Sequence, residues 1–229
     1  GGTLNMTGSS PTIWSDGAPA RNASLNSNIT GSNGLTFDNG LLWLGGTNTY
    51  NGNTFLTGAA PYILLTTNAS LPSTTIVDIN ATGILRLWNS VSATCAGVTG
   101  SGELRGQNTS CILTVSRNDG GTSTFSGTVR NNTALQLVKQ GNFTQVLSGA
   151  NANVQLFKAT VSGGTLALAK TAGFNAVTYG ATFPTTITVS GGQLRLDAAN
   201  QIDDVATMAL SGGTFNANGV SESLGALTL

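Results

Sequence analysis

The sequence predicts an all-β protein built as a parallel β-solenoid, in which short strands and tight turns wind into stacked coils. Gly, Thr, Asn and Ser supply 109 of the 229 residues, and these residue types are poor in helix interiors. The phrase Ser-Gly-Gly followed by alternating apolar residues occurs at 162–168, 190–196 and 211–215. One such unit cannot bury its apolar side alone, so the repetition predicts that units stack and share a core.

A compact β-sandwich also contains short alternating strands and is the alternative fold. It gives no reason for the same phrase to recur in neighbouring segments. At about 22 residues a coil the chain forms roughly ten coils, and about 4.8 Å per coil makes a rod on the order of 50 Å long. We expect one elongated domain over residues 1–229.

Charge and composition exclude several classes of function. The chain has 9 Lys+Arg and 9 Asp+Glu, a formal net charge of zero and no basic run, so neither nucleic acid nor an anionic membrane surface is expected as a partner. No apolar run approaches the roughly 20 residues that span a bilayer, which predicts no membrane insertion. The absence of His removes the usual general base and the commonest zinc ligand. We therefore expect no enzyme, no cofactor and no metal.

Two cysteines, Cys95 and Cys111, are the only ones in the chain, and they do not form a Cys-x-x-Cys pair. A disulfide between them is favoured over two buried free thiols, and would stabilise the fold by about 3 kcal/mol. It would place the protein in an oxidising compartment. Because residues 90–119 match none of the repeated phrases, we expect an irregular, disulfide-bearing insertion there.

Four further segments occur in a defined order. They read WLGGTNTYNGNT at 43–54, LSGANAN at 147–153, LDAANQI at 196–202 and GGTFNANG at 212–219. This series resembles the passenger-associated transport repeats, also called autotransporter-associated β-strand repeats, of bacterial surface proteins. It departs from them at Ala152 and Val154, where the family has Thr and Tyr. The resemblance implies a right-handed β-helix exported to the cell surface, with a structural or adhesive role and no catalytic residues.

Three functions are compared. The first is an extracellular structural protein, a surface filament, stalk or sheath whose copies stack end to end, because no charge precedes Asp16 or follows Glu222 to cap the stack. The second is an adhesin that binds surface glycans. A remote third is a polysaccharide-lyase-like enzyme with a Ca²⁺ site at Asp197, Asp203 and Asp204 beside Arg195, although these residues are better explained as a solvated turn.

Candidate contact residues lie in the segment 84–88. Leu85 and Leu87 occupy one strand face, which leaves Arg86 and Trp88 together on the other, either as plain surface or as a contact for a glycan or a neighbouring subunit. Trp43, with apolar residues in both phases of its strand, is expected to be buried. Candidate glycosylation sites are the Asn-x-Ser/Thr sequons at Asn5, Asn22, Asn28, Asn68, Asn80, Asn108, Asn131 and Asn142.

Overall fold

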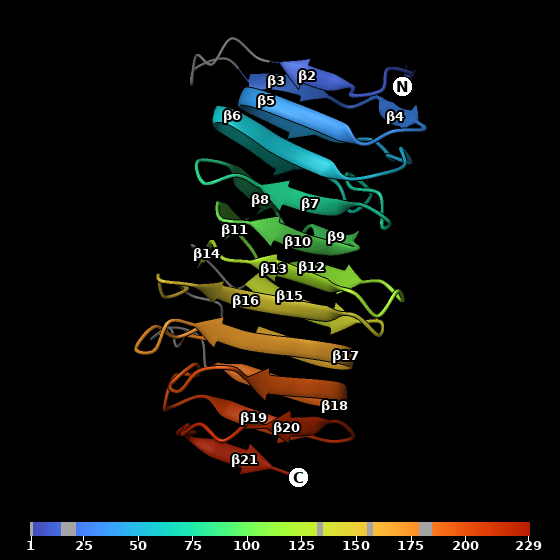
Figure 1. Cartoon of the computed structure of the whole chain (residues 1–229). Helices are drawn as coiled ribbons and strands as arrows, with labels where there is room; N and C mark the ends of the chain where they lie inside the picture. Colours follow the sequence, from blue (N-terminus) through green and yellow to red (C-terminus); the bar gives the residue numbers. More distant parts are fainter. Residues whose placement is uncertain (1, 15–21, 132–134, 155–157, 179–184) are drawn as a thin grey trace.

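A computed structural model gives the structure of residues 2–14, 22–131, 135–154, 158–178 and 185–229. These residues wind into about ten stacked coils, and the two ends of the chain lie at opposite ends of the stack (Figure 1). Every strand pair found among them is parallel. This confirms the predicted β-solenoid and excludes the sandwich, which is built from antiparallel sheets.

The strands of successive coils lie above one another in three columns. The first column contains β1 (Thr3–Met6), β4 (Asn28–Gly31), β9 (Ser92–Cys95), β12 (Cys111–Ser116), β15 (Leu135–Gln140), the first halves of β17 (Lys158–Lys170) and β18 (Thr186–Leu196), β19 (Thr207–Leu210) and β21 (Ala226–Thr228). The second contains β2 (Thr12–Trp14), the first halves of β5 (Leu35–Leu44) and β6 (Thr54–Leu65), β7 (Ile76–Ile79), β10 (Gly97–Gly100), β13 (Thr122–Phe125), β16 (Thr144–Gly149), the second halves of β17 and β18, and β20 (Thr214–Asn216).

The third column contains β3 (Asn22–Leu25), the second halves of β5 and β6, β8 (Ile84–Trp88), β11 (Glu103–Gln107) and β14 (Thr128–Asn131). Beyond β14 it narrows to two isolated bridges, one at Val154 and one between Val177 and Ile202. Its regular part therefore ends at β14.

The repeated Ser-Gly-Gly phrase forms a corner between the first and second columns. Strands β17 and β18 turn through this corner, and in their register Ser162 lies opposite Gly191. Gly164 and Gly192 have φ of +59° and +66°, a conformation that a side chain disfavours. A Cβ on Gly192 would also overlap the carbonyl oxygen of Gly164 one coil earlier. The phrase recurs because the backbones of successive corners stack in direct contact, which leaves no room for a side chain at these glycines.

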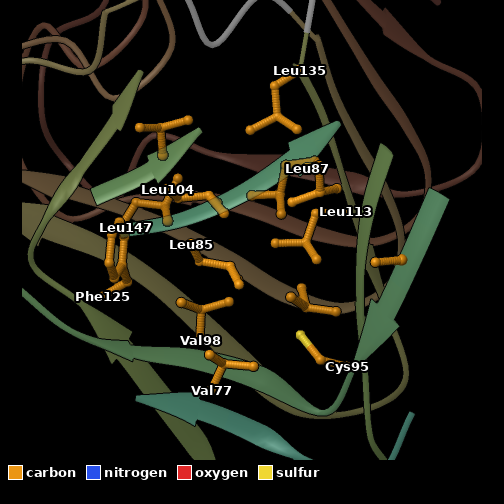
Figure 2. Close-up of a cluster of buried hydrophobic side chains, with 14 of the residues drawn as sticks. Val77, Leu85, Leu87, Cys95, Val98, Leu104, Leu113, Phe125, Leu135 and Leu147 are labelled. Carbon is orange, nitrogen blue, oxygen red and sulfur yellow. The ribbon is translucent and has the colours of Figure 1, made fainter. Parts of the chain in front are cut away.

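The core is one continuous apolar cluster along the axis of the stack. Alternation in each strand directs every second side chain inward, as in β8, where Leu85 and Leu87 are buried. Figure 2 shows the three columns meeting in this core, with Leu104 from the third column, Val98 and Phe125 from the second and Cys95 from the first pointing toward one another.

Residues 90–119 do not form the irregular insertion expected from the sequence. They supply β9 to β12, all in register with neighbouring coils. The expected disulfide is also wrong, since Cys95 and Cys111 are both buried free thiols. Cys95 pairs with Val115, four residues beyond Cys111 on β12. Four residues at about 3.3 Å each separate the two cysteines by far more than the roughly 7 Å that a disulfide bridges.

Buried asparagines connect coils where a regular strand is missing. In residues 43–54, Asn48 is 4% exposed and its Oδ1 accepts a hydrogen bond from Ile29 N–H at 2.8 Å, in the coil before. Its Nδ2 donates to the carbonyl of Ser70 at 2.7 Å, in the coil after. Asn153, in residues 147–153, makes the same pair of contacts with its own neighbouring coils. These two carboxamides replace strand pairing with side-chain hydrogen bonds.

Candidate functional site

The outer surface of the third column carries a group of polar and aromatic side chains, which we call the lateral face. Its members point away from the core on β5, β6, β8, β11 and β14. The lateral face consists of Trp43, Tyr62, Leu64, Arg86, Trp88, Glu103, Arg105, Gln107 and Arg130. The two residues singled out from the sequence, Arg86 and Trp88, lie together on it, as their alternation with Leu85 and Leu87 predicts.

Three arginines form a ladder on the lateral face. Arg86, Arg105 and Arg130 are direct register partners on the adjacent strands β8, β11 and β14. Neighbouring strands lie about 4.8 Å apart, and like charges directly opposite one another destabilise a sheet. The ladder is therefore stable only if other groups compensate some of its charge.

Glu103 supplies that compensation for one rung of the ladder. Its carboxylate forms a two-pronged ion pair with Arg105, through Nε and through Nη2 at 2.8 Å, and this pairing raises the pKa of Arg105. The Nε of Arg130 is 3.9 Å from the same carboxylate, and its side chain is 57% exposed. One carboxylate thus faces three guanidinium groups, which leaves two formal positive charges.

Arg86 has neither a hydrogen bond nor an ion pair among the described residues. Its guanidinium carbon lies 4.8 Å from the centre of the Tyr62 ring, a cation–π contact. Burial lowers the pKa of Arg86, because a partly buried cation loses part of its hydration. Arg86 is the least compensated charge on the lateral face.

Two tryptophans form the aromatic end of the lateral face. The rings of Trp43 and Trp88 are 6.2 Å apart between centroids and tilted by 42°. Trp43 is half-buried on the outside of the sheet, so the expectation that it belongs to the interior is wrong. Between the two strands that carry these rings, Leu64 on β6 is only 3% exposed although it lies outside the core cluster. An outer apolar layer therefore covers this part of the sheet.

The lateral face also contains buried polar atoms that have no hydrogen-bond partner. Within the described part of the chain, four buried side-chain polar atoms have no hydrogen-bond partner: Trp43 Nε1, Tyr62 Oη, Arg86 Nε and Gln107 Oε1. All four belong to this one surface. Buried polar groups are usually paired, so this cluster of unpaired atoms sets the lateral face apart from the rest of the described residues.

The acidic residues considered for a Ca²⁺ site do not converge. Asp197 is ion-paired with Arg195, with Nε 2.6 Å from Oδ1. Asp203 and Asp204 line an open hollow elsewhere, together with Asn200. Among the residues with described positions, no three His, Cys, Asp or Glu side chains are grouped to hold a metal ion.

Most of the sequon asparagines lie at coil corners and bind the adjacent coil. A carboxamide hydrogen bond of 2.8–2.9 Å reaches a residue one coil earlier or later from Asn28, Asn68, Asn80, Asn108 and Asn142. Asn5 is exposed on β1 and accepts a longer bond from Thr30. The side chains of Asn22 and Asn131 lie outside the described residues. Glycosylation at these positions stays a prediction.

Sequence reasoning missed the remaining members of the arginine ladder. Arg86 and Arg105 are 19 residues apart, whereas Arg105 and Arg130 are 25 apart, so no fixed period aligns them. The signal that could have found them is the strand pattern itself, because each arginine follows a buried Leu or Val at the same phase of its strand.

The fold and the lateral face define a class of protein, the parallel β-solenoid with a cationic and aromatic side surface. No protein-family model, curated protein or solved structure matches the chain. The described residues also contain no apolar helix of membrane-spanning length. The functional assignment therefore rests on the geometry described above.

Proposed function

We propose that the chain is a structural, rod-forming part of an exported bacterial surface protein, serving in a filament, stalk or sheath of the kind built from passenger-associated transport repeats. The observation that carries this proposal is the role of Asn48 and Asn153. Both belong to the repeat-like segments, and the carboxamide of each accepts a hydrogen bond from the coil before and donates one to the coil after. A motif whose conspicuous polar residue is consumed by coil stacking has an architectural purpose.

Uncharged polar contacts between coils support the same role. Within the core, the hydroxyl groups of Tyr50, Thr54 and Thr75 form a buried chain at 2.6 and 2.8 Å that links successive coils. Such contacts depend little on salt or pH, in contrast with surface ion pairs. A rod stabilised in this way suits exposure outside the cell.

We further propose that copies of the chain stack end to end. At one end of the described stack, Leu4 lies in register with the buried Ile29, and at the other Leu227 lies in register with the buried Met208. Both outer residues continue a core position but are exposed, at 37% and 50%. Each end can therefore accept a further parallel coil, and head-to-tail addition gives an open filament.

Electron microscopy of the untagged chain over a dilution series tests this assembly. We expect filaments whose axial repeat is near the length of one rod, about 50 Å for ten coils. Leu227→Lys should abolish them by placing a charge in the coil-to-coil contact, whereas Phe174→Lys, at an exposed turn on the side of the stack, should leave them intact. Monodisperse short rods at every concentration contradict end-to-end stacking, and the role is then that of a stalk segment.

A second function, adhesion to surface glycans, is favoured by one specific observation. Arg86, which has no ion-pair partner among the described residues, and the aromatic rings beside it form an outer surface that does not contribute to the stacking of coils.

A further inference from the structure

We propose that the lateral face is a binding site for an acidic polysaccharide, a glycan that carries carboxylate or sulfate groups. Arg86 and Arg130 would hold the acidic groups, and Trp88 with Tyr62 would contact the sugar rings. This inference extends the adhesive function to one class of ligand. It does not depend on end-to-end stacking, because the site is complete within one copy of the chain.

The charge of the site favours an anion. The carboxylate of Glu103 neutralises Arg105, whereas Arg86 and Arg130 on the neighbouring strands have no carboxylate of their own in the described part of the chain. Guanidinium groups bind carboxylate and sulfate through paired N–H donors, a geometry that their planar fork provides. An anion beside Arg86 would replace the hydration that this side chain has lost.

The hydrogen-bonding groups favour a hydroxylated anion over a polymer of phosphates. Trp43 Nε1 and Arg86 Nε are unpaired donors, the Tyr62 hydroxyl can donate or accept, and Gln107 Oε1 is an unpaired acceptor. Sugar hydroxyl groups both donate and accept, so they can satisfy this mixed set. A DNA backbone offers acceptors only and would meet Gln107 Oε1 and the Glu103 carboxylate unfavourably.

The register fixes the direction in which the ligand would lie. The arginines follow one another on three successive coils, a span of about 10 Å along the rod axis. Trp88 lies beside Arg86 on β8, and Trp43 extends the surface toward the N-terminal coils on β5, whose place in the stack is seen in Figure 1. A linear polysaccharide aligned with the rod would meet the three arginines on successive coils, with Trp88 beside Arg86 and Trp43 beyond it.

Access to the shielded atoms requires only side-chain movement. The four unpaired atoms are shielded from solvent, whereas β8 and β11 are held by regular pairing on both sides. Rotamer changes without backbone movement are common when a rigid surface binds its partner. We therefore expect no change in secondary structure on binding.

Intrinsic fluorescence provides a direct test. The chain has three tryptophans, and Trp14 is 65% exposed on the second column, away from the lateral face. In a Trp14→Phe background, emission comes only from Trp43 and Trp88. Titration with polygalacturonate or heparin at fixed ionic strength should change this emission in a saturable way, whereas neutral dextran should not.

Two variants of equal charge change separate the site from general electrostatics. Arg86→Gln should weaken binding of the acidic polysaccharide at least tenfold, and Lys158→Gln, on the exposed side of the first column, should change it less than twofold. Circular dichroism checks that both variants keep the fold.

No saturable response to either acidic polysaccharide, or an equal loss of binding in both variants, overturns the proposal. Tighter binding of double-stranded DNA than of both glycans also overturns it, because the face is then a general polyanion site. None of these results bears on filament formation, which microscopy reports separately.

Discussion

The amide N–H of Val129 donates a 2.9 Å hydrogen bond to Oδ1 of Asn153, one coil later. The Nδ2 of the same side chain donates to the carbonyl of Ala176 at 2.7 Å, so a single buried carboxamide spans three coils. This contact lies where the third column loses its regular strands, beside the isolated bridge at Val154. It holds the coils together on the side of the third column, whereas the first and second columns keep regular strand pairing past β14.

Asn153→Ala should therefore lower the free energy of unfolding by about 2 to 4 kcal/mol, since each buried backbone group left unpaired costs about 1 to 3 kcal/mol. Guanidinium denaturation measures the change. Asn151→Ala makes the same substitution at an exposed position two residues earlier and should change stability by less than about 0.5 kcal/mol. Equal losses in the two variants would show that the carboxamide of Asn153 does not hold the coils together.

Alternation and repeated phrases were enough to predict the solenoid, the core positions Leu85 and Leu87 and the pairing of Arg86 with Trp88 on one face. They could not predict which residues of neighbouring coils lie side by side, because the register between coils decides this. Coils differ in length, as the 19- and 25-residue steps of the arginine ladder show, so a sequence separation does not translate into a spatial neighbour. The same limitation explains the failed disulfide, because Cys111 follows Cys95 by sixteen residues, whereas the register partner of Cys95 is Val115, twenty residues away.

Thiol chemistry should report two free cysteines. Burial raises the pKa of Cys95 to about 12, and both thiols lie in the interior, where a reagent cannot reach them. We expect negligible reaction with Ellman's reagent in the native state and two thiols per chain in guanidinium without reductant. Protein purified under oxidising conditions that shows no titratable thiol when unfolded would contradict the register assigned to β9 and β12.

Stability should rise with pH in a range that Lys170 sets. This lysine is 1% exposed, its Nζ donates to the carbonyl of Gly127 at 2.6 Å, and burial lowers its pKa to about 8. In the unfolded chain its pKa is the ordinary value of about 10.4. Between these two values the unfolded state binds more protons, so raising the pH from 8 to 10 favours the folded state.

The measurement compares the wild type with Lys170→Met at pH 7, 8, 9 and 10, because Cys95 acts in the opposite direction above pH 9 in both proteins. The difference in stability between wild type and variant should shift in favour of the wild type as the pH rises. Lys158→Met, which removes an exposed lysine from the start of β17, is the matched control for the loss of a lysine. A difference independent of pH would mean that Lys170 keeps its ordinary pKa in the folded protein.

Two glycines with the same backbone conformation separate conformational strain from close coil contact. Gly100 and Gly173 have φ of +91° and +90°, so alanine is unfavourable at both by about 1 kcal/mol. Only at Gly100 would the added Cβ overlap a neighbour, the carbonyl oxygen of Ile79 one coil earlier; at Gly173 it meets open space. That carbonyl accepts hydrogen bonds from the N–H groups of Ser101 and Gly102 and cannot move without breaking them.

Gly100→Ala should therefore cost about 1 to 3 kcal/mol more than Gly173→Ala, the range expected when a packed site is overfilled. Thermal and guanidinium unfolding of the two variants in parallel give the comparison. If the two losses are equal, the corner at Gly100 has room for a side chain, and the spacing between the coils of Ile79 and Gly100 is wider than a stacked solenoid requires. If Gly100→Ala alone is strongly destabilised, close backbone contact between coils is the reason that glycine recurs along this chain.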